Sequence, residues 1–264
     1  MKKYLQIIKG TIEEYLVYRL SFILWRVRMV MQLLVIYFLW WAIFASHKTL
    51  FGYTQGMMLT YILLSAVMRP FIMGTRTQEV GSIINEGDLS NYLLRPLNFL
   101  RYYVFADIAD KALNVFFAIF EIILLYLLLR PPIFIQTNPA FLLLTVMATF
   151  IGAVLFFYFS MMLSYLAFWT PDVWAPRFLS FVLIEFFAGM LFPLDILPKP
   201  LFYLSTALPF SYFIYFPLKV YLGQLNYQVI AVGLAIGFTW MFGLQYLTSI
   251  MWRKGLRVYT AEGR

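Results

Sequence analysis

The sequence predicts an all-α integral membrane protein with six transmembrane helices, and its composition is the first observation behind this prediction. Of the 264 residues, 63% are hydrophobic and 12% are charged, and the mean hydropathy is +0.81. A soluble domain is nearer half apolar and a quarter charged, so lipid is the expected solvent for most of this chain. Several apolar stretches also approach the roughly 20 residues that a helix needs to cross the hydrocarbon layer.

The formal charge of +8 and the absence of cysteine exclude several classes of protein. No basic run or basic helical face with interleaved aromatic residues stands clear of the apolar segments, so no nucleic-acid partner is expected. Without cysteine the chain holds no disulfide, thiolate metal site or cysteine nucleophile. The N-terminal stretch lacks a small-residue cleavage site after its apolar part, so we expect no removable signal peptide.

Residues 1–28 alternate charged and apolar residues at spacings near three and four. This pattern predicts an amphipathic helix that lies on the membrane surface. The six spans are expected at residues 29–45, 55–73, 104–129, 140–169, 178–192 and 229–251. Gly233 and Gly237 in the last span have the spacing that lets helices approach closely. The only histidine, His47, lies in a short polar loop and is expected to be solvated.

Residues 75–101 form the longest polar interruption in the first two-thirds of the chain. Thr75 begins a capping-box pattern that is followed by apolar residues at helical spacing. Gly87 can end this first helix, and Asp88 can cap a second helix that Pro96 stops. We therefore expect a helix, a break and a second helix, although the same residues would equally suit an ordinary interfacial loop.

Residues 193–224 are apolar enough to enter the membrane but are rich in proline, with Pro193, Pro198, Pro200, Pro209 and Pro217. A single regular helix exposed to lipid would leave backbone carbonyls unpaired there. Short re-entrant or interfacial helices are expected instead.

The distribution of basic residues predicts the orientation of the chain. With six spans and both termini cytoplasmic, only four of the 20 lysine and arginine residues face outside, namely Lys48, Arg130, Lys199 and Lys219. Such an excess of positive charge on one side is typical of the cytoplasmic face. Residues 75–101 are then cytoplasmic and residues 193–224 external.

No motif for catalysis is visible, because the chain contains no P-loop, HExxH or GxSxG pattern. Glu121 and Glu185 fall within expected spans, where an ionisable residue often marks a pathway. Each acid could equally be protonated or hydrogen-bonded to a neighbouring helix. A proton-driven secondary transporter that uses both carboxylates is therefore an alternative function. An aromatic cavity between the spans would suit a hydrophobic or cationic amphiphile.

Four stretches of this sequence resemble the permease subunits of ABC-2 type exporters, in particular a bacterial branch formerly catalogued as a domain of unknown function. They are EGDLSNYLLRPLN at residues 86–98, FPLDILP at residues 192–198, LPFSYFIYFPLKVYLG at residues 208–223 and the C-terminal WRKGLRVYTAEGR. The likeness covers essentially the whole chain, and the first motif is the most specific.

The resemblance implies a type-2 ABC exporter fold in a single permease domain over residues 1–264. Residues 75–101 would include a coupling helix that docks into a separate ATP-binding subunit. The implied contact residues are Glu79, Glu86, Gly87, Asp88, Leu89, Tyr92, Leu93, Arg95 and Pro96. A substrate pathway between two permeases would be lined by residues such as Met68, Glu121, Glu185 and Phe186.

The resemblance also implies the partners and the location. We expect two copies of an ATPase subunit, a second permease that is identical or homologous, and the lipid of a bacterial plasma membrane. ATP and Mg²⁺ would bind the ATPase, so no cofactor, metal or enzymatic activity is expected in this chain. Hydrophobic drugs, peptides and lipids all stay open as substrates.

Overall fold

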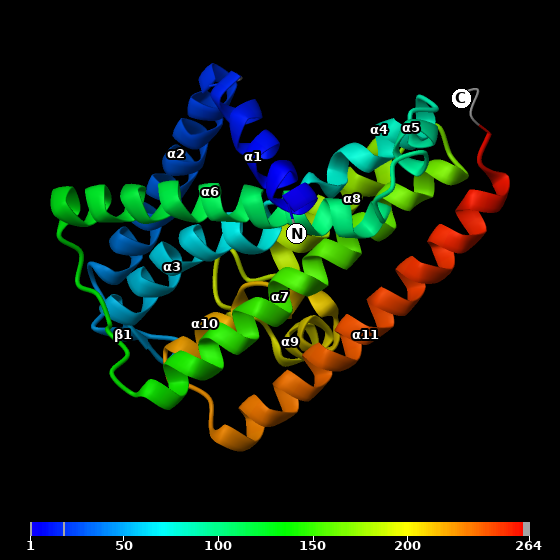
Figure 1. Cartoon of the computed structure of the whole chain (residues 1–264). Helices are drawn as coiled ribbons and strands as arrows, with labels where there is room; N and C mark the ends of the chain where they lie inside the picture. Colours follow the sequence, from blue (N-terminus) through cyan, green and yellow to red (C-terminus); the bar gives the residue numbers. More distant parts are fainter. Residues whose placement is uncertain (1, 18, 261–264) are drawn as a thin grey trace.

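The computed structural model describes residues 2–17 and 19–260 as a bundle of helices (Figure 1). Within these residues, five helices are long and apolar enough to cross a membrane. They are α2 (Arg19–Phe44), α3 (Gln55–Met73), α6 (Phe99–Leu129), α7 (Pro139–Tyr165), continued by the 3-10 helix η2 (Leu166–Phe168), and α11 (Tyr227–Val258). These helices make the chain a multi-pass α-helical membrane protein.

The expected count of six spans is not confirmed. The proposed fifth span, residues 178–192, falls on α8 (Trp174–Phe187), whose 14 residues reach about 21 Å at 1.5 Å per residue. That length is short of the ~30 Å of hydrocarbon. The chain turns at Gly189, whose φ of +76° is a conformation that glycine adopts at little cost. The Tyr61 hydroxyl donates a 2.6 Å hydrogen bond to the Gly189 carbonyl, which holds this turn inside the bundle.

The proline-rich stretch folds as four short helices, in agreement with the expectation of broken helices there. They are η3 (Leu194–Ile196), α9 (Lys199–Ala207), η4 (Pro209–Tyr212) and α10 (Tyr215–Tyr221). The last two are almost wholly buried, and α10 packs against α7 (Figure 1). A Cβ on Gly152 of α7 would lie 2.7 Å from the Tyr212 carbonyl oxygen, so only glycine permits this close contact.

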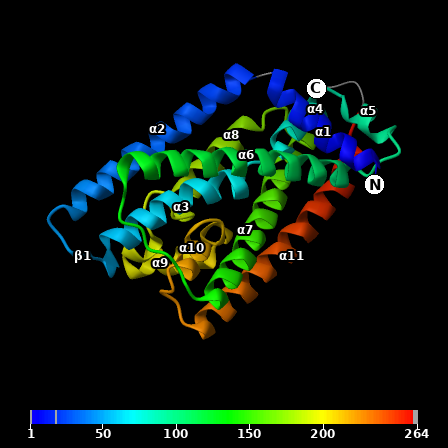
Figure 2. The ribbon, with the colours of Figure 1, turned by 60° about the vertical axis from the view of Figure 1, so that its left-hand side comes forward.

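The N-terminal region is divided differently from the expected single helix over residues 1–28. The first helix, α1 (Lys2–Val17), is separate from α2, which begins at Arg19 and carries Arg26 within a candidate span. The two helices point in different directions, and α1 lies beside the first part of α6 (Figure 2). The Tyr15 hydroxyl donates a hydrogen bond to the Asp110 carboxylate, which fixes α1 to α6.

Two opposite ends of the bundle are recognisable in Figure 2. A short antiparallel hairpin, β1 (Thr49–Leu50) and β2 (Tyr53–Thr54), joins α2 to α3 at one end. The other end holds the polar stretch between α3 and α6, the start of α1 and the end of α11. We call these the hairpin end and the polar-loop end.

The long helices begin at side-chain caps and pack closely where glycine allows. Asn98, Asn138 and Asn226 each accept a hydrogen bond from a backbone amide in the first turn of α6, α7 and α11. In α11, a Cβ on Gly233 would lie 2.3 Å from the Phe216 ring. The glycine spacing in the last span therefore does permit close approach, here between helices of the same chain.

Candidate functional site

The polar stretch of residues 75–101 forms the predicted helix, break and second helix. It contains the 3-10 helix η1 (Arg76–Glu79), α4 (Val80–Asn85) and α5 (Leu89–Leu93). Gly87 lies between α4 and α5 with a φ of +82°, as expected of a helix-ending glycine. Asp88 does not cap α5 with its side chain. Its Oδ1 instead accepts a 3.2 Å hydrogen bond from the Asn91 side chain.

An apolar cluster fastens these helices to the bundle. Val80, Ile84 and Leu89 are buried together with Tyr103 of α6 and Phe168 of η2. Leu89 and Val80 are fully inaccessible to solvent. Of the predicted contact residues, Leu89 and Gly87 are therefore buried, and they shape the element instead of facing outward.

Hydrogen bonds from three other segments brace the same element. The Tyr259 hydroxyl, just beyond α11, donates to the Gly87 carbonyl at 2.5 Å and accepts from the Ser90 amide at 3.2 Å. The Thr77 hydroxyl donates to Ser160 of α7 at 2.7 Å. The Asn85 side chain donates to the Pro171 carbonyl at 2.8 Å.

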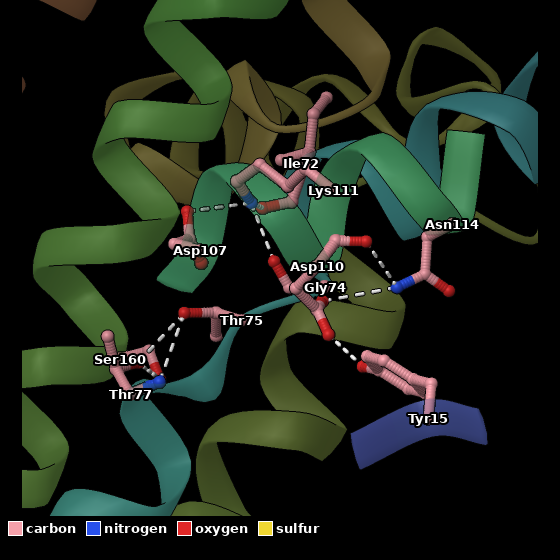
Figure 3. Close-up of polar contacts among 10 residues, drawn as sticks. All are labelled: Tyr15, Ile72, Gly74, Thr75, Thr77, Asp107, Asp110, Lys111, Asn114 and Ser160. Carbon is pink, nitrogen blue, oxygen red and sulfur yellow. Dashed lines mark hydrogen bonds and ion pairs between the residues drawn. The ribbon is translucent and has the colours of Figure 1, made fainter. Parts of the chain in front are cut away.

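A buried polar cluster beneath the element joins it to α3, α6 and α1 (Figure 3). Lys111 of α6 donates to the carbonyls of Ile72 at 3.1 Å and Gly74 at 2.6 Å, and thereby satisfies carbonyls at the C-terminal end of α3. Its Nζ also lies 3.3 Å from an oxygen of Asp107. Asp110 accepts hydrogen bonds from Tyr15 and from Asn114 one turn further along α6. Beside this cluster, η1 contacts α6 and α7 and α4 contacts α7 directly, and η1 follows α3 along the chain.

The outward face of the element is exposed and mixes charged with apolar residues. Glu79, Glu86, Asp88, Arg95 and Pro96 are all exposed, and Leu93 is 46% exposed. Tyr92 is half-buried, and the Arg95 guanidinium lies 4.6 Å from the centre of its ring.

Leu94 is a residue of this face that the sequence prediction missed. It is 84% exposed, the most exposed of the large hydrophobic residues in the described part of the chain. The sequence contains a signal for this exposure, because Leu89, Tyr92 and Leu93 have the spacing of one helical face and Leu94 falls outside that face. Leu94 and the neighbouring Leu93 are thus both exposed beside Pro96.

A groove separates this face from α1. It has a volume of about 600 Å³ and is lined by residues that include Gly10, Thr11, Arg76, Arg95 and Pro96. Arg76 forms an ion pair with Glu14 of α1 across the groove. The Glu14 contact raises the pKa of Arg76, although burial opposes it, so this guanidinium stays charged.

Both acids that the sequence places within spans, Glu121 and Glu185, are paired with arginine. Glu121 of α6 accepts two hydrogen bonds of 2.6 Å from Arg26 of α2. Glu185 of α8 forms an ion pair with Arg69 of α3. All four side chains line one cavity of about 50 Å³ between α2, α3, α6 and α8.

The other two predicted pathway residues lie outside this cavity. Met68 is partly buried and packs against the main core. Phe186 is 38% exposed and contacts Phe187 and Phe192. The sequence does not reveal these two ion pairs, because charge counting places Arg26 and Arg69 on the cytoplasmic face. Each arginine is also far from its acid in the sequence, by 95 and 116 positions.

A further buried ion pair, which the sequence did not reveal, lies at the hairpin end. Lys219 of α10 donates to Asp195 at 2.7 Å, to Tyr53 at 3.0 Å and to Gln224 at 2.5 Å. Burial lowers the pKa of Lys219, an effect that Asp195 opposes. These contacts tie the hairpin to both ends of the proline-rich stretch.

Comparison with known proteins adds one finding on the family. A family model described as "ABC-2 family transporter protein" matches residues 29–263. A search of curated proteins finds no match. Within the described residues, no group of three histidine, cysteine or acidic side chains could hold a metal ion.

Proposed function

Because this chain belongs to the ABC-2 transporter family, we propose that it is the permease subunit of an ATP-driven exporter and that η1, α4 and α5 dock a separate ATPase. The whole chain would act as a single permease domain, with the exposed residues of the polar-loop end as its coupling surface. We define this surface as Glu79, Glu86, Asp88, Leu93, Leu94, Arg95 and Pro96. Gly87, Leu89 and Tyr92 would hold its shape.

The observation that carries the proposal is that α4 and α5, two short helices with an exposed outer face, are anchored to the bundle on their inner face. An ATPase subunit that moves on binding ATP can move the permease only if the element it docks against is rigid and firmly attached to the bundle. The buried apolar cluster and the Tyr259, Thr77 and Lys111 hydrogen bonds supply this rigidity. Movement of the coupling surface would be passed to α3, α6, α7 and α11 together.

The assembly would contain two ATPase subunits, which bind ATP and Mg²⁺, and a second permease that is identical or homologous to this chain. The start of α1 and the end of α11 lie at the same end as the coupling surface (Figure 2). Together with the excess of basic residues, this supports cytoplasmic termini in a bacterial plasma membrane. The proline-rich stretch at the hairpin end would then cover the external exit.

The substrate pathway would pass the cavity that holds Glu121 and Glu185, with Met68 and Phe186 on neighbouring surfaces. A proton-driven mechanism is not favoured. A guanidinium stays charged at all physiological pH values, so each acid is compensated by an ion pair and needs no proton to lie in the membrane.

Co-purification with the ATPase subunit tests the coupling surface. Leu94→Ser and Arg95→Glu should each abolish or strongly reduce recovery of the complex, while the permease still folds. Leu204→Ser is the matched control, because Leu204 is 50% exposed but lies on α9, away from the coupling surface. Normal recovery of the complex with both coupling-surface variants would refute this docking site.

A further inference from the structure

A second groove, separate from the coupling surface, opens between α2, α3, α7 and α8. Its volume is about 490 Å³. Trp174 and Arg177 of α8, near the polar-loop end, line one part of it, and the Arg69–Glu185 pair lines another. Aromatic side chains of α7 and α8 form much of the remaining wall.

The lining carries more positive than negative charge. Three arginines, Arg28, Arg69 and Arg177, face a single carboxylate, that of Glu185. Arg69 is already paired with Glu185. Among the described residues, Arg28 has no carboxylate within ion-pair distance, and Arg177 donates only to uncharged oxygens, those of Ser164 and Gln78. Two guanidinium charges are therefore uncompensated.

The side of the groove formed by α8 is strongly apolar. Trp174 is 68% exposed and Phe178 is 54% exposed, and their rings stack with centres 5.2 Å apart. Tryptophan near basic residues is typical of the boundary between head groups and hydrocarbon. The groove thus places guanidinium groups next to a surface suited to an acyl or aromatic tail.

We propose that this groove binds an amphiphile with one anionic head group, a phosphate or a carboxylate, whose apolar tail lies along α8. Guanidinium groups bind such head groups through charge-assisted, often bidentate, hydrogen bonds. A cationic amphiphile, which the aromatic content alone would suit, is disfavoured because Arg28 and Arg177 repel it. The proposal concerns the chain alone and does not depend on the ATPase.

Binding to the purified full chain in neutral detergent tests the ligand class. The probes are phosphatidylglycerol, phosphatidylcholine with the same acyl chains, and inorganic phosphate. Native mass spectrometry and the unfolding temperature are the readouts. We expect phosphatidylglycerol to be retained and to raise the unfolding temperature, and the other two to do neither at the same concentration. Equal binding of phosphatidylcholine, or an equal effect of phosphate alone, would overturn the proposal.

Arg28→Gln tests the site without removing a contact, because Arg28 is exposed and makes no ion pair or side-chain hydrogen bond within the described residues. Loss of one such charge should weaken phosphatidylglycerol binding about five-fold, and Arg28→Glu should weaken it further. Arg101→Gln is the matched control, since Arg101 is exposed at the same end but does not line the groove. If Arg101→Gln weakens binding as much as Arg28→Gln, diffuse surface charge explains it and the site is refuted.

Discussion

Breaking the Arg26–Glu121 pair tests how the bundle tolerates charge within its spans. The two side chains are only 8% and 21% exposed, and two hydrogen bonds of 2.6 Å join them. Removing one partner of a buried pair typically costs about 3–5 kcal/mol. Glu121→Gln keeps one neutral acceptor, and Arg26 also lies 5.7 Å from the Trp25 ring. We therefore expect a loss of about 2–3 kcal/mol.

A double-mutant cycle separates the pair from its surroundings. Arg26→Gln should destabilise the protein by a similar amount, and the double variant should recover much of the loss because its two amides can hydrogen-bond. Reversible unfolding in mixed micelles would measure the coupling, which should be at least about 1.5 kcal/mol. Single variants of native stability, or strictly additive losses, would refute the reasoning.

The same double variant distinguishes the two modes of energy supply. A proton carrier needs a carboxylate at position 121, so a proton-driven transporter would lose transport in the double variant. An ATP-driven exporter in which the pair is structural should keep it. Transport in proteoliposomes that contain the ATPase subunit, with and without a proton gradient, provides this measurement.

Three further predictions follow from individual contacts. Gly255→Ala should destabilise the protein by about 1–3 kcal/mol, because its Cβ would lie 2.1 Å from the Phe168 ring. In the control Gly243→Ala, in the same helix, the new Cβ meets no atom within 4 Å, so this variant should be neutral or stabilising. Thermal unfolding compares the two variants, and equal effects would contradict the packing. Tyr259→Phe removes the hydroxyl that hydrogen-bonds to Gly87 and Ser90 and should lower the local stability by about 1–2 kcal/mol. We expect faster amide hydrogen exchange in α5 and weaker co-purification with the ATPase subunit. Unchanged exchange would show that the apolar cluster alone holds α5 in place. Burial holds the pKa of Lys219 in the folded protein below its ordinary value of 10.5. Between the folded and the unfolded pKa the unfolded chain binds more protons, so this group's contribution to stability rises with pH in that range. Lys219→Met should abolish this part of the pH dependence in unfolding experiments, and an identical pH profile of the variant would refute it.

Local signals predicted the helices of the polar loop well, because the residues that end them lie within the loop sequence itself. Gly87 and Pro96 mark the end of each short helix, and both boundaries hold in the structure. The exposure of Leu94 also follows from helical spacing, once the buried face of α5 is known. The broken helices between residues 193 and 224 were likewise visible in the prolines.

Features that depend on distant contacts were not predictable. The Arg26–Glu121 pair joins residues 95 positions apart, and no periodicity connects them. The short α8 was missed because apolar composition continues past Phe187, while the turn at Gly189 is fixed by Tyr61 from α3. The separation of α1 from α2 has no glycine or proline signal, since residues 11–28 contain neither.

Site-specific crosslinking tests the central claim most directly, and the absence of native cysteine makes the chain ready for it. A photoreactive maleimide is attached to Leu94→Cys or, as the control, to Leu204→Cys, in the presence of the ATPase subunit. The account predicts a crosslink from position 94 to the ATPase, with a yield that changes when ATP is added, and none from position 204. A crosslink from position 204 with none from position 94 would contradict the assignment of η1, α4 and α5 as the ATPase-coupling element.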